Sequence, residues 1–343
     1  MATKQQVKES LDSILVPAVN RSLAGLNIIR EIDVTDGKVR INLASPALDI
    51  DTQNWIKAKA KETTEKLPEV TKVEINFIEC SPKDLNEISK VIAVMSGKGG
   101  VGKSLVTALL AVALARQGKD VGILDADITG PSIPKMFGIG SSRPKGNESG
   151  FLPVLSRSGI TIMSLNLILE HEDDAVIWRG PLIAGAIKQF WEEVLWGKLD
   201  YLLVDLPPGT ADASLTVMQS LPLSGVVIVF SPQELAAMVV RKSVQMAQKM
   251  EIPILGVVEN MSYLILPESG KKLEIFGKSK AGEMAKAAGA PLLGQIPIDP
   301  ELARLCDEGE IERYQSDITN GFVDALTEAL AVRGKVTRKE DGK

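Results

Sequence analysis

Histidine and cysteine are almost absent from this chain of 343 residues. The single histidine is His171, and the two cysteines are Cys80 and Cys306. A mechanism that needs a pair of histidines, or a metal site rich in histidine, therefore cannot be built from one chain. Two cysteines also provide no disulfide framework, which is typical of a protein of the reducing cytoplasm.

Long hydrophobic runs and an excess of positive charge are missing as well. No apolar run approaches the roughly 18 residues that a membrane-spanning helix needs. The N-terminal segment lacks the apolar centre of a signal peptide. The formal net charge of −5 argues against nucleic acid as a general partner. We therefore expect a cytoplasmic protein whose partners include neither nucleic acid nor a membrane.

Residues 97–104 carry the most informative pattern that is present. They read Gly-Lys-Gly-Gly-Val-Gly-Lys-Ser, which matches the phosphate-binding pattern G-x-x-x-x-G-K-[ST]. A strand-like run at 91–95 precedes the pattern, and a run suited to a buried helix follows at 104–115. In that context backbone N–H groups turn inward around phosphate oxygens. The pattern predicts a nucleoside triphosphate site lined by Gly97, Lys98, Gly99, Gly100, Val101, Gly102, Lys103 and Ser104.

Two of these residues have defined roles, and a third has two interpretations. Lys103 reaches the β- and γ-phosphates, and Ser104 ligates Mg²⁺. Lys98 is a second lysine with no evident task inside one subunit, because Lys103 already supplies the phosphate lysine. Alone, Lys98 is an ordinary exposed loop lysine. Beside Lys103, it is a candidate to reach across a dimer interface to a partner's γ-phosphate, as an arginine finger does.

Acidic residues follow two predicted strands, which is where an open α/β sheet binds its ligands. The strand at 201–204 is followed by Asp205, the form of a Walker B aspartate that holds Mg²⁺. Asp125 and Asp127 come at the end of the strand at 121–126 and can point together at metal and water. Asp127 is suited to orient a water for attack on the γ-phosphate. The simpler alternatives are a capping aspartate for Asp205 and a solvated turn for the pair.

The first 80 residues form a unit of their own, and residues 81–90 read as a linker. The Asp-Gly pair in the turn at 35–38 is a hairpin signal, and residues 70–78 alternate between apolar and polar side chains. The order of helix, hairpin, helix and strand predicts a small α+β domain over 1–80. Its expected helices lie near 4–15 and 51–67.

From residue 91 to 332 the pattern changes to short apolar strands that alternate with helices. This alternation predicts an α/β domain with a doubly wound, mostly parallel sheet. Residues 138–150 are a candidate flexible loop or lid, and the charged tail at 333–343 is expected to fray. The expected strands lie at 91–95, 121–126, 159–165, 201–204, 225–230, 254–258 and 291–295.

Taken in order, the motifs resemble those of the deviant Walker A ATPases related to MinD and ParA. Within that group they are similar to the Mrp-type iron–sulfur cluster carrier ATPases. The likeness extends over about residues 88–330 and rests on the segments at 96–104, 125–134, 178–181, 200–210 and 256–263. The first 80 residues resemble the small domain often found ahead of this ATPase, which is also linked to iron–sulfur assembly.

The resemblance implies a homodimer that binds and slowly hydrolyses Mg·ATP, with iron–sulfur assembly or client proteins as partners. By this likeness Lys98 is the signature lysine that acts in trans. Asp127 is the hydrolytic aspartate, and Asp205 is the Walker B residue. Asn260 and the segment that begins at Pro297 are implied base contacts. A nucleotide-controlled switch that carries no cluster is the alternative, and a small-molecule kinase is a third possibility.

One segment departs from the family pattern. The family places a C-P-x-C pair just after the 256–263 segment, so that two chains supply four thiolates to one cluster. Here the sequence reads Leu266-Pro267-Glu268-Ser269, so Leu266 and Ser269 replace both thiols. Because iron–sulfur clusters need thiolates, we predict no cluster ligand in this chain, and cluster binding is in doubt. The proline loop at 45–49 lacks its frequent cysteine too.

Overall fold

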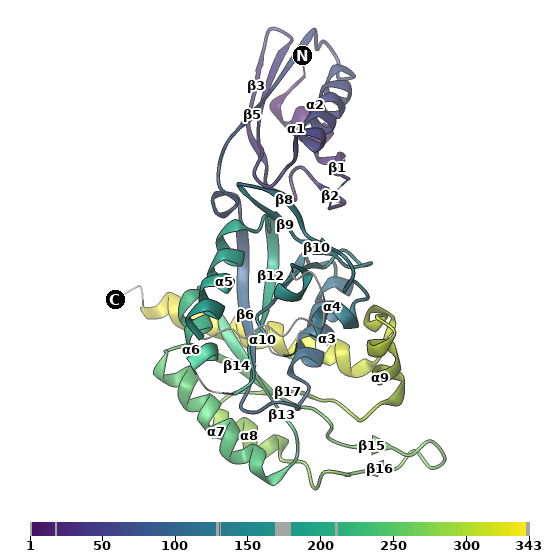
Figure 1. The fold of residues 1–343 in the computed structure, drawn as a ribbon, viewed down its shortest axis with the longest axis vertical. Coiled ribbons are helices and arrows are strands. Elements are labelled where there is room, and N and C mark those ends of the chain that lie inside the picture. The colour runs from purple at the N-terminus through teal and green to yellow at the C-terminus, as the bar shows by residue number, and fades with distance from the viewer. Residues whose placement is uncertain are drawn as a thin grey trace. The chain divides into compact units, whose positions relative to one another are not determined.

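The computed structural model describes residues 2–17, 19–127, 130, 132–168, 180–209 and 212–340. The chain folds into two compact units (Figure 1). The first comprises Met1–Ser89, Ser142–Leu155 and Gln189–Asp200, and the second comprises Lys90–Ser141, Ser156–Lys188 and Tyr201–Lys343.

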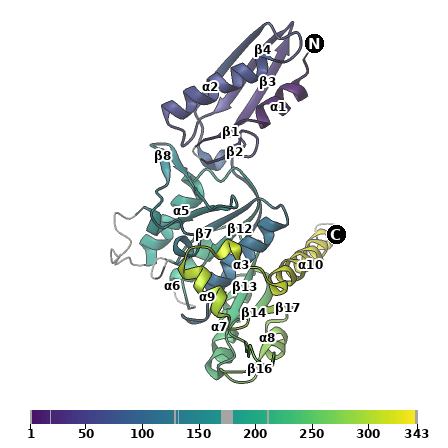
Figure 2. The same cartoon turned by 90° about the vertical axis from the view of Figure 1, so that its right-hand side faces the viewer.

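The first unit is built on a three-stranded sheet. Strand β3 (Ile29–Thr35) pairs antiparallel with β4 (Lys38–Ala44), and β4 pairs parallel with β5 (Lys72–Ile78). In the hairpin turn Asp36 and Gly37 have φ of 50° and 75°, as a type I′ turn requires. Figure 2 shows α1 (Lys4–Asp12) and α2 (Ile50–Glu65) lying along this sheet.

Apolar side chains at alternating positions bury the inner face of this sheet. Val39, Ile41 and Leu43 of β4 are almost fully buried, and Val7 of α1 and Ile56 of α2 pack in the same core. The predicted order of helix, hairpin, helix and strand is therefore confirmed. The remaining elements of this unit are β1 (Leu15–Val16), β2 (Arg21–Ser22), a 3₁₀ turn (Pro82–Asp84), β8 (Lys145–Asn147), β9 (Gly150–Leu152) and β10 (Val154–Leu155).

The segment at 138–150 differs from the flexible loop that the sequence suggests. Strands β8 and β9 pair antiparallel, with Asn147 opposite Gly150. Asn147 Nδ2 donates to the Leu48 carbonyl at 3.0 Å, and the Ala47 N–H donates to Ser149 Oγ at 3.2 Å. These bonds give the tip of the hairpin defined partners, which a glycine- and serine-rich sequence does not reveal.

The second unit contains a parallel sheet in the strand order β11-β7-β12-β6-β13-β14-β17. The strand pairs β11–β7, β12–β7, β6–β13, β13–β14 and β14–β17 are all parallel. Each strand corresponds to one predicted from the sequence. Their bounds are β6 (Glu87–Ser96), β7 (Val121–Asp125), β11 (Thr161–Ser164), β12 (Lys198–Asp205), β13 (Gly225–Phe230), β14 (Ile254–Glu259) and β17 (Leu292–Gln295).

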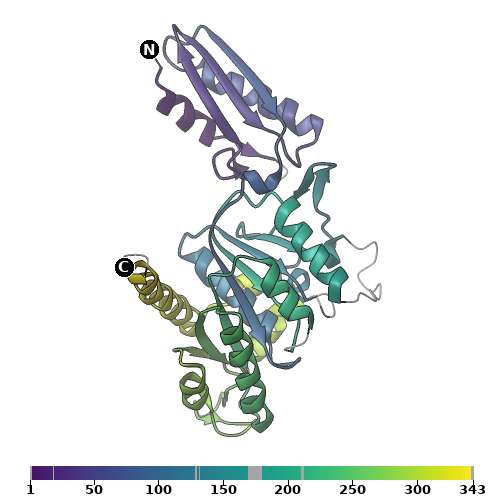
Figure 3. The same cartoon turned by 90° about the vertical axis from the view of Figure 1, so that its left-hand side faces the viewer.

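Helices cover this sheet, which is why the central parts of its strands are apolar. Every residue of β7, β13 and β14 is buried, as expected for a parallel sheet that is covered on both faces. Helices α3 (Lys103–Arg116) and α10 (Asp317–Glu340) contact each other and the sheet, and α7 (Glu234–Lys249) and α8 (Ala281–Ala288) form a second contacting pair. Figure 3 shows α7 and α8 side by side in green. The predicted doubly wound α/β fold is confirmed.

The last helix packs against the sheet, as its amphipathic sequence predicts. Phe322, Val323 and Leu326 of α10 are buried. The helix continues to Glu340, so residues 333–340 are helical where the sequence suggests a frayed tail. None of the helices in the described part of the chain has the length and apolar character needed to cross a bilayer. The remaining α-helices and strands are α4 (Ile133–Met136), α5 (Gly180–Glu193), α6 (Asp212–Ser220), β15 (Leu264–Ile265), β16 (Lys272–Leu273) and α9 (Pro300–Asp307).

Candidate functional site

The glycine loop joins the end of β6 to the start of α3. Gly102 caps the N-terminus of α3 with a left-handed φ of 80°, and Gly100 has a φ of 78°. Only glycine adopts such angles at little cost. Because α3 begins at Lys103, its unpaired N–H groups and the positive end of its dipole lie beside the loop, where an anion is stabilised.

Lys103 is buried between two carboxylates. Its Nζ lies 2.8 Å from Asp205 Oδ2 and 3.4 Å from Asp127 Oδ2, and only 5% of the side chain is exposed. Buried charges are tolerated only when they are paired in this way. The structure therefore brings the predicted phosphate lysine together with two of the three predicted aspartates.

Asp205 joins the end of β12 to the first turn of α3. The hydroxyl of Ser104 donates to Asp205 Oδ2, and the hydroxyl of Thr107 donates to Asp205 Oδ1 at 2.8 Å. Thr107 was missed by the sequence analysis. Its signal was its place one helical turn after Lys103, whose carbonyl also accepts from the Thr107 hydroxyl.

Asp125 lies behind the cavity rather than on its wall. Its Oδ1 accepts from the Asp127 N–H at 3.1 Å, and its Oδ2 accepts from the Ser164 hydroxyl at 3.0 Å. Burial, reinforced by the negative charge of Asp205, raises the pKa of the Asp125 carboxyl well above its ordinary value. Asp125 thus anchors the backbone that carries Asp127, while Asp127 itself faces the cavity.

The donor set fits Mg²⁺. Ser104 supplies a hydroxyl and Asp205 a carboxylate, and hard oxygen ligands of this kind are the ones that Mg²⁺ prefers. No group of three or more acidic, histidine or cysteine side chains in the described residues could hold a metal without other ligands. Mg²⁺ takes one or two carboxylates from a protein and completes its shell with water and substrate phosphates.

The cavity above these groups has a volume of about 370 Å³. Residues of the glycine loop line it together with Lys103 and Asp127, whose Nζ and Oδ2 lie 3.4 Å apart. Its lining residues are Ser96, Gly99, Gly100, Val101, Gly102, Lys103, Ser104, Leu105, Asp127, Gly130, Ser132, Met136 and Pro208.

Lys98 has a partner within its own chain. Its Nζ donates to Oε1 of Gln233, the residue just before α7, at 2.5 Å, and its carbonyl accepts from the Ser96 hydroxyl at 3.0 Å. The half-buried lysine is therefore not an ordinary solvent-exposed loop residue. Gln233 was missed by the sequence analysis because it lies 135 positions away in the chain.

The two predicted base contacts lie at the ends of β14 and β17. Asn260 is 2% exposed, and its side chain points at the glycine loop, where Nδ2 donates to the Val101 carbonyl at 2.9 Å. Pro297 is buried just after β17. Neither residue is among those that line the 370 Å³ cavity, and contact of either with a base stays a prediction.

The segment that replaces the C-P-x-C pair closes a small hairpin between β15 and β16. The Leu266 N–H donates to the Lys271 carbonyl at 2.9 Å, and the Gly270 N–H donates back to the Leu266 carbonyl at 2.8 Å. Ser269 Oγ accepts from the Lys271 N–H. The hairpin is thus held by backbone bonds, and it carries no thiol.

The two cysteines are partly buried and lie in different units of the chain. Burial raises the pKa of the Cys80 thiol, and burial together with Asp307 raises the pKa of Cys306 to about 11. Burial therefore favours the neutral thiol at both positions, whereas a cluster binds thiolates.

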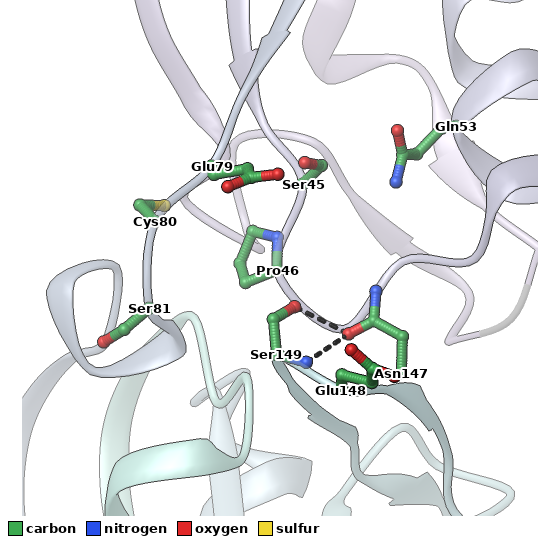
Figure 4. A pocket seen from close by; sticks show the side chains of 9 residues that line it. All are labelled: Ser45, Pro46, Gln53, Glu79, Cys80, Ser81, Asn147, Glu148 and Ser149. Carbon is green, nitrogen blue, oxygen red and sulfur yellow. Dashed lines mark hydrogen bonds between the residues drawn. The ribbon is translucent and has the colours of Figure 1, made fainter.

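A larger cavity of about 750 Å³ lies in the first unit (Figure 4). Cys80 faces Ser45 and Pro46 across it, and Asn147 Oδ1 accepts from both the N–H and the hydroxyl of Ser149. It lacks the buried charged groups of the glycine-loop cavity. His171, Trp178 at the start of the 178–181 segment and Thr210 at the end of the 200–210 segment lie outside the described residues.

A glycine loop before a helix, a buried lysine and a magnesium-type donor set on a parallel sheet define a P-loop NTPase. A family model described as the NUBPL iron-transfer P-loop NTPase matches residues 87–331, and a model described as iron–sulfur cluster assembly protein matches residues 4–76. The chain belongs to this iron-transfer P-loop NTPase family, as the resemblance in the motifs predicts.

Curated relatives carry the name iron–sulfur cluster carrier protein. One from Clostridium perfringens is 48% identical over 237 residues, covering 67% of this chain and 83% of that protein. One from Aquifex aeolicus is 37% identical over 345 residues, covering 92% and 93%. Among solved structures, a nucleotide-binding protein in complex with ADP from Archaeoglobus fulgidus is 50% identical with a TM-score of 0.62, covering 68% of this chain and 92% of that one.

Proposed function

We propose that this chain binds Mg·ATP at residues 97–104 and hydrolyses it slowly as a homodimer. The observation that carries the proposal is the buried Lys103, whose Nζ lies beside two carboxylates at the N-terminus of α3. The ADP complex of the relative from Archaeoglobus fulgidus supports the nucleotide part of the proposal.

Each group at the site has a task in phosphoryl transfer to water. The phosphates of ATP supply acceptors for Lys103 Nζ and for the N–H groups of the glycine loop. Ser104 and Asp205 would hold Mg²⁺, which offsets the negative charge of the phosphates. Asp127 accepts a hydrogen bond from the attacking water and orients it in line with the γ-phosphate.

Lys98 completes the site in the dimer. In the proposed cycle its Nζ leaves Gln233 and reaches the γ-phosphate bound by the second copy of the chain. A cation placed there stabilises the charge that develops in the transition state. Because each chain then lacks one catalytic cation until it pairs, hydrolysis depends on dimerisation.

We further propose that ATP hydrolysis serves iron–sulfur cluster assembly, with client proteins as partners. Membership of the iron-transfer family and the matching small domain favour this role over a switch unconnected with clusters. We infer that residues 1–80 and 91–332 act as separate domains joined by 81–90, with residues 142–155 and 189–200 of the larger domain forming part of the first compact unit. The two family matches, which end and begin near this linker, support the division.

Calorimetric titration of the protein with Mg·ATP, followed by measurement of phosphate release, tests the ATPase. Saturable binding with slow release of one phosphate per ATP is expected, and no binding would contradict the proposal.

Anaerobic reconstitution with iron and sulfide tests whether the chain binds a cluster. Because this chain lacks the family thiols, we expect less than one stable cluster per dimer after gel filtration. A stoichiometric cluster would mean that Cys80 or Cys306 is a ligand.

A further inference from the structure

The side chain of Asn260 is held against the centre of the glycine loop. Its Nδ2 donates to the Val101 carbonyl at 2.9 Å, and its own backbone N–H donates to the Phe230 carbonyl at 2.8 Å. The residue is 2% exposed. Its amide is so close to Gly102 that a Cβ added there would lie 2.0 Å from Nδ2. The contact is therefore tight, and it requires a glycine at position 102 of the loop.

The bond to Val101 controls a peptide unit that phosphate would use. The Val101 carbonyl and the Gly102 N–H belong to one trans peptide and point in opposite directions. This peptide rotates about the Cα–C bond of Val101 and the N–Cα bond of Gly102, and Gly102, which has a φ of 80° and no Cβ, restricts that rotation little. By holding the carbonyl, Asn260 fixes the Gly102 N–H in the opposite direction, away from itself, and Gly102 is one of the residues that line the cavity.

The residue before Asn260 is anchored unusually well. Glu259 is fully buried, and its carboxylate accepts from the Ser262 hydroxyl at 2.6 Å and the Ser279 hydroxyl at 2.7 Å. The Lys280 N–H and Gln295 Nε2 also donate to it, each at 2.7 Å. These bonds connect the end of β14 to β17 and to the start of α8, so the backbone that carries Asn260 cannot shift without breaking them.

We propose that Asn260 is a positioning residue of the phosphate site, which keeps the Gly102 N–H aimed at the bound phosphates. The inference rests on the proposed nucleotide binding and assigns Asn260 a role different from a base contact. A base contact acts only on nucleotides, whereas a brace of the loop acts on any ligand that carries the phosphate chain.

The test compares ADP with inorganic tripolyphosphate, which has no base, as ligands for the full chain in the presence of Mg²⁺. Asn260→Asp replaces the donating amide with an acceptor that repels the Val101 carbonyl, and Asn260→Ala removes the donor without adding charge. Both variants should bind both ligands about tenfold more weakly than the wild type, as expected when a buried carbonyl loses its donor. Calorimetric titration measures each affinity.

Weakened binding of ADP with unchanged binding of tripolyphosphate would overturn the inference and favour the base contact. Unchanged binding of both ligands would overturn it too. Asn147→Asp is the matched control, because Asn147 Nδ2 likewise donates to a backbone carbonyl, that of Leu48, but in the other unit. It should leave both affinities unchanged. If the wild-type chain binds neither ligand, the proposed function itself is wrong. The wild-type titrations therefore test the proposed function, and the comparison with the Asn260 variants tests the inference.

Discussion

At the scale of single residues, the two lysines of the glycine loop differ in what holds them. Lys103 is buried between Asp127 and Asp205, where charge pairing is strong because water is excluded. Lys98 is half-buried and bonded to the neutral side chain of Gln233, which it can leave at a modest cost. Lys103 is therefore suited to stay in place as the phosphate-binding lysine, and Lys98 is suited to leave Gln233 for another partner.

Replacement of Lys103 should abolish nucleotide binding. In Lys103→Ala the phosphates lose their buried cation, and we expect affinity for Mg·ATP to fall by at least about 100-fold. Asp205 would be left without its ion-pair partner, so the melting temperature should fall by several degrees. Titration calorimetry and thermal unfolding measure the two effects. Wild-type affinity in this variant would show that the loop is not the nucleotide site.

Replacement of Lys98 should separate binding from turnover. Lys98→Ala leaves Lys103 and the magnesium ligands in place, so affinity for Mg·ATP should change by less than about threefold. The rate of phosphate release should fall by at least about tenfold, because a cation is missing from the transition state. Gln233→Ala, which removes the partner but keeps the lysine, is the control and should retain turnover. Equal rates in Lys98→Ala and wild type would rule out a catalytic role for this lysine.

The thiol of Cys306 should make stability depend on pH in the alkaline range. Its pKa is raised from an ordinary value of 9.0 to about 11, mainly by burial, so the folded state holds this proton more tightly than the unfolded state does. The resulting stabilisation is complete below pH 9 and is lost as pH rises toward 11. Urea unfolding at pH 8 and pH 10 should show a steeper loss for the wild type than for Cys306→Ser. Identical slopes for the two proteins would mean that Cys306 is not shielded.

At the scale of elements, α10 packs closely on β17 at the position of one glycine. Phe322 of α10 is fully buried against Gly294 of β17, and a Cβ at that glycine would lie only 1.7 Å from Phe322 Cε1. The ring therefore occupies the space that any other residue would need. This close approach holds the last helix against the sheet edge that also carries Gln295, a donor to Glu259.

Gly294→Ala should destabilise the fold by about 1–3 kcal/mol, because the added methyl group displaces the ring of Phe322. Gly282→Ala is the control, for which we expect no loss of stability. It lies within α8 with nothing within 4 Å of its added Cβ, so it should be neutral or stabilising by up to about 1 kcal/mol. Free energies of unfolding from urea titrations compare the two variants. Equal effects would contradict the packing of α10 on β17.

At the scale of the whole molecule, ATP binding and dimerisation should be linked. A lysine that acts in trans has its partner only when two chains share bound nucleotide, and a ligand shared by two chains stabilises their complex. The same linkage would allow hydrolysis to dissociate the proposed dimer and so to release a bound client protein. The hairpin at Leu264–Leu273 lacks the thiols that the family pattern places there, so we expect no contribution of a cluster to the stability of the proposed dimer.

Blocking hydrolysis should therefore trap the dimer. Asp127→Ala removes the proposed water-orienting carboxylate but leaves Lys103 paired with Asp205, so ATP should still bind. Light scattering after gel filtration should give about 74 kDa, twice the chain mass of 36.8 kDa, for this variant with Mg·ATP. The same variant with Mg·ADP should be a monomer. A monomer with ATP at micromolar protein concentration would contradict the nucleotide-bridged dimer.

The sequence by itself determined the features that depend on neighbouring residues. The glycine loop at 97–104, the Asp36-Gly37 turn and the alternation of apolar strands with helices were predicted correctly, because spacing and backbone preference act locally. Asp205 was placed beside Ser104 for a related reason, since parallel strands bring their carboxyl ends to one edge of a sheet.

Only the tertiary structure decided which distant side chains meet. Asn260 reaches Val101 across 159 positions, and Gln233 reaches Lys98 across 135. Asp125 and Asp127, which the sequence treats as an equivalent pair, are separated into an anchor behind the cavity and a carboxylate that faces it. Such contacts follow from how strands and helices pack in three dimensions. The sequence pattern of one segment does not identify the distant residues that it will contact.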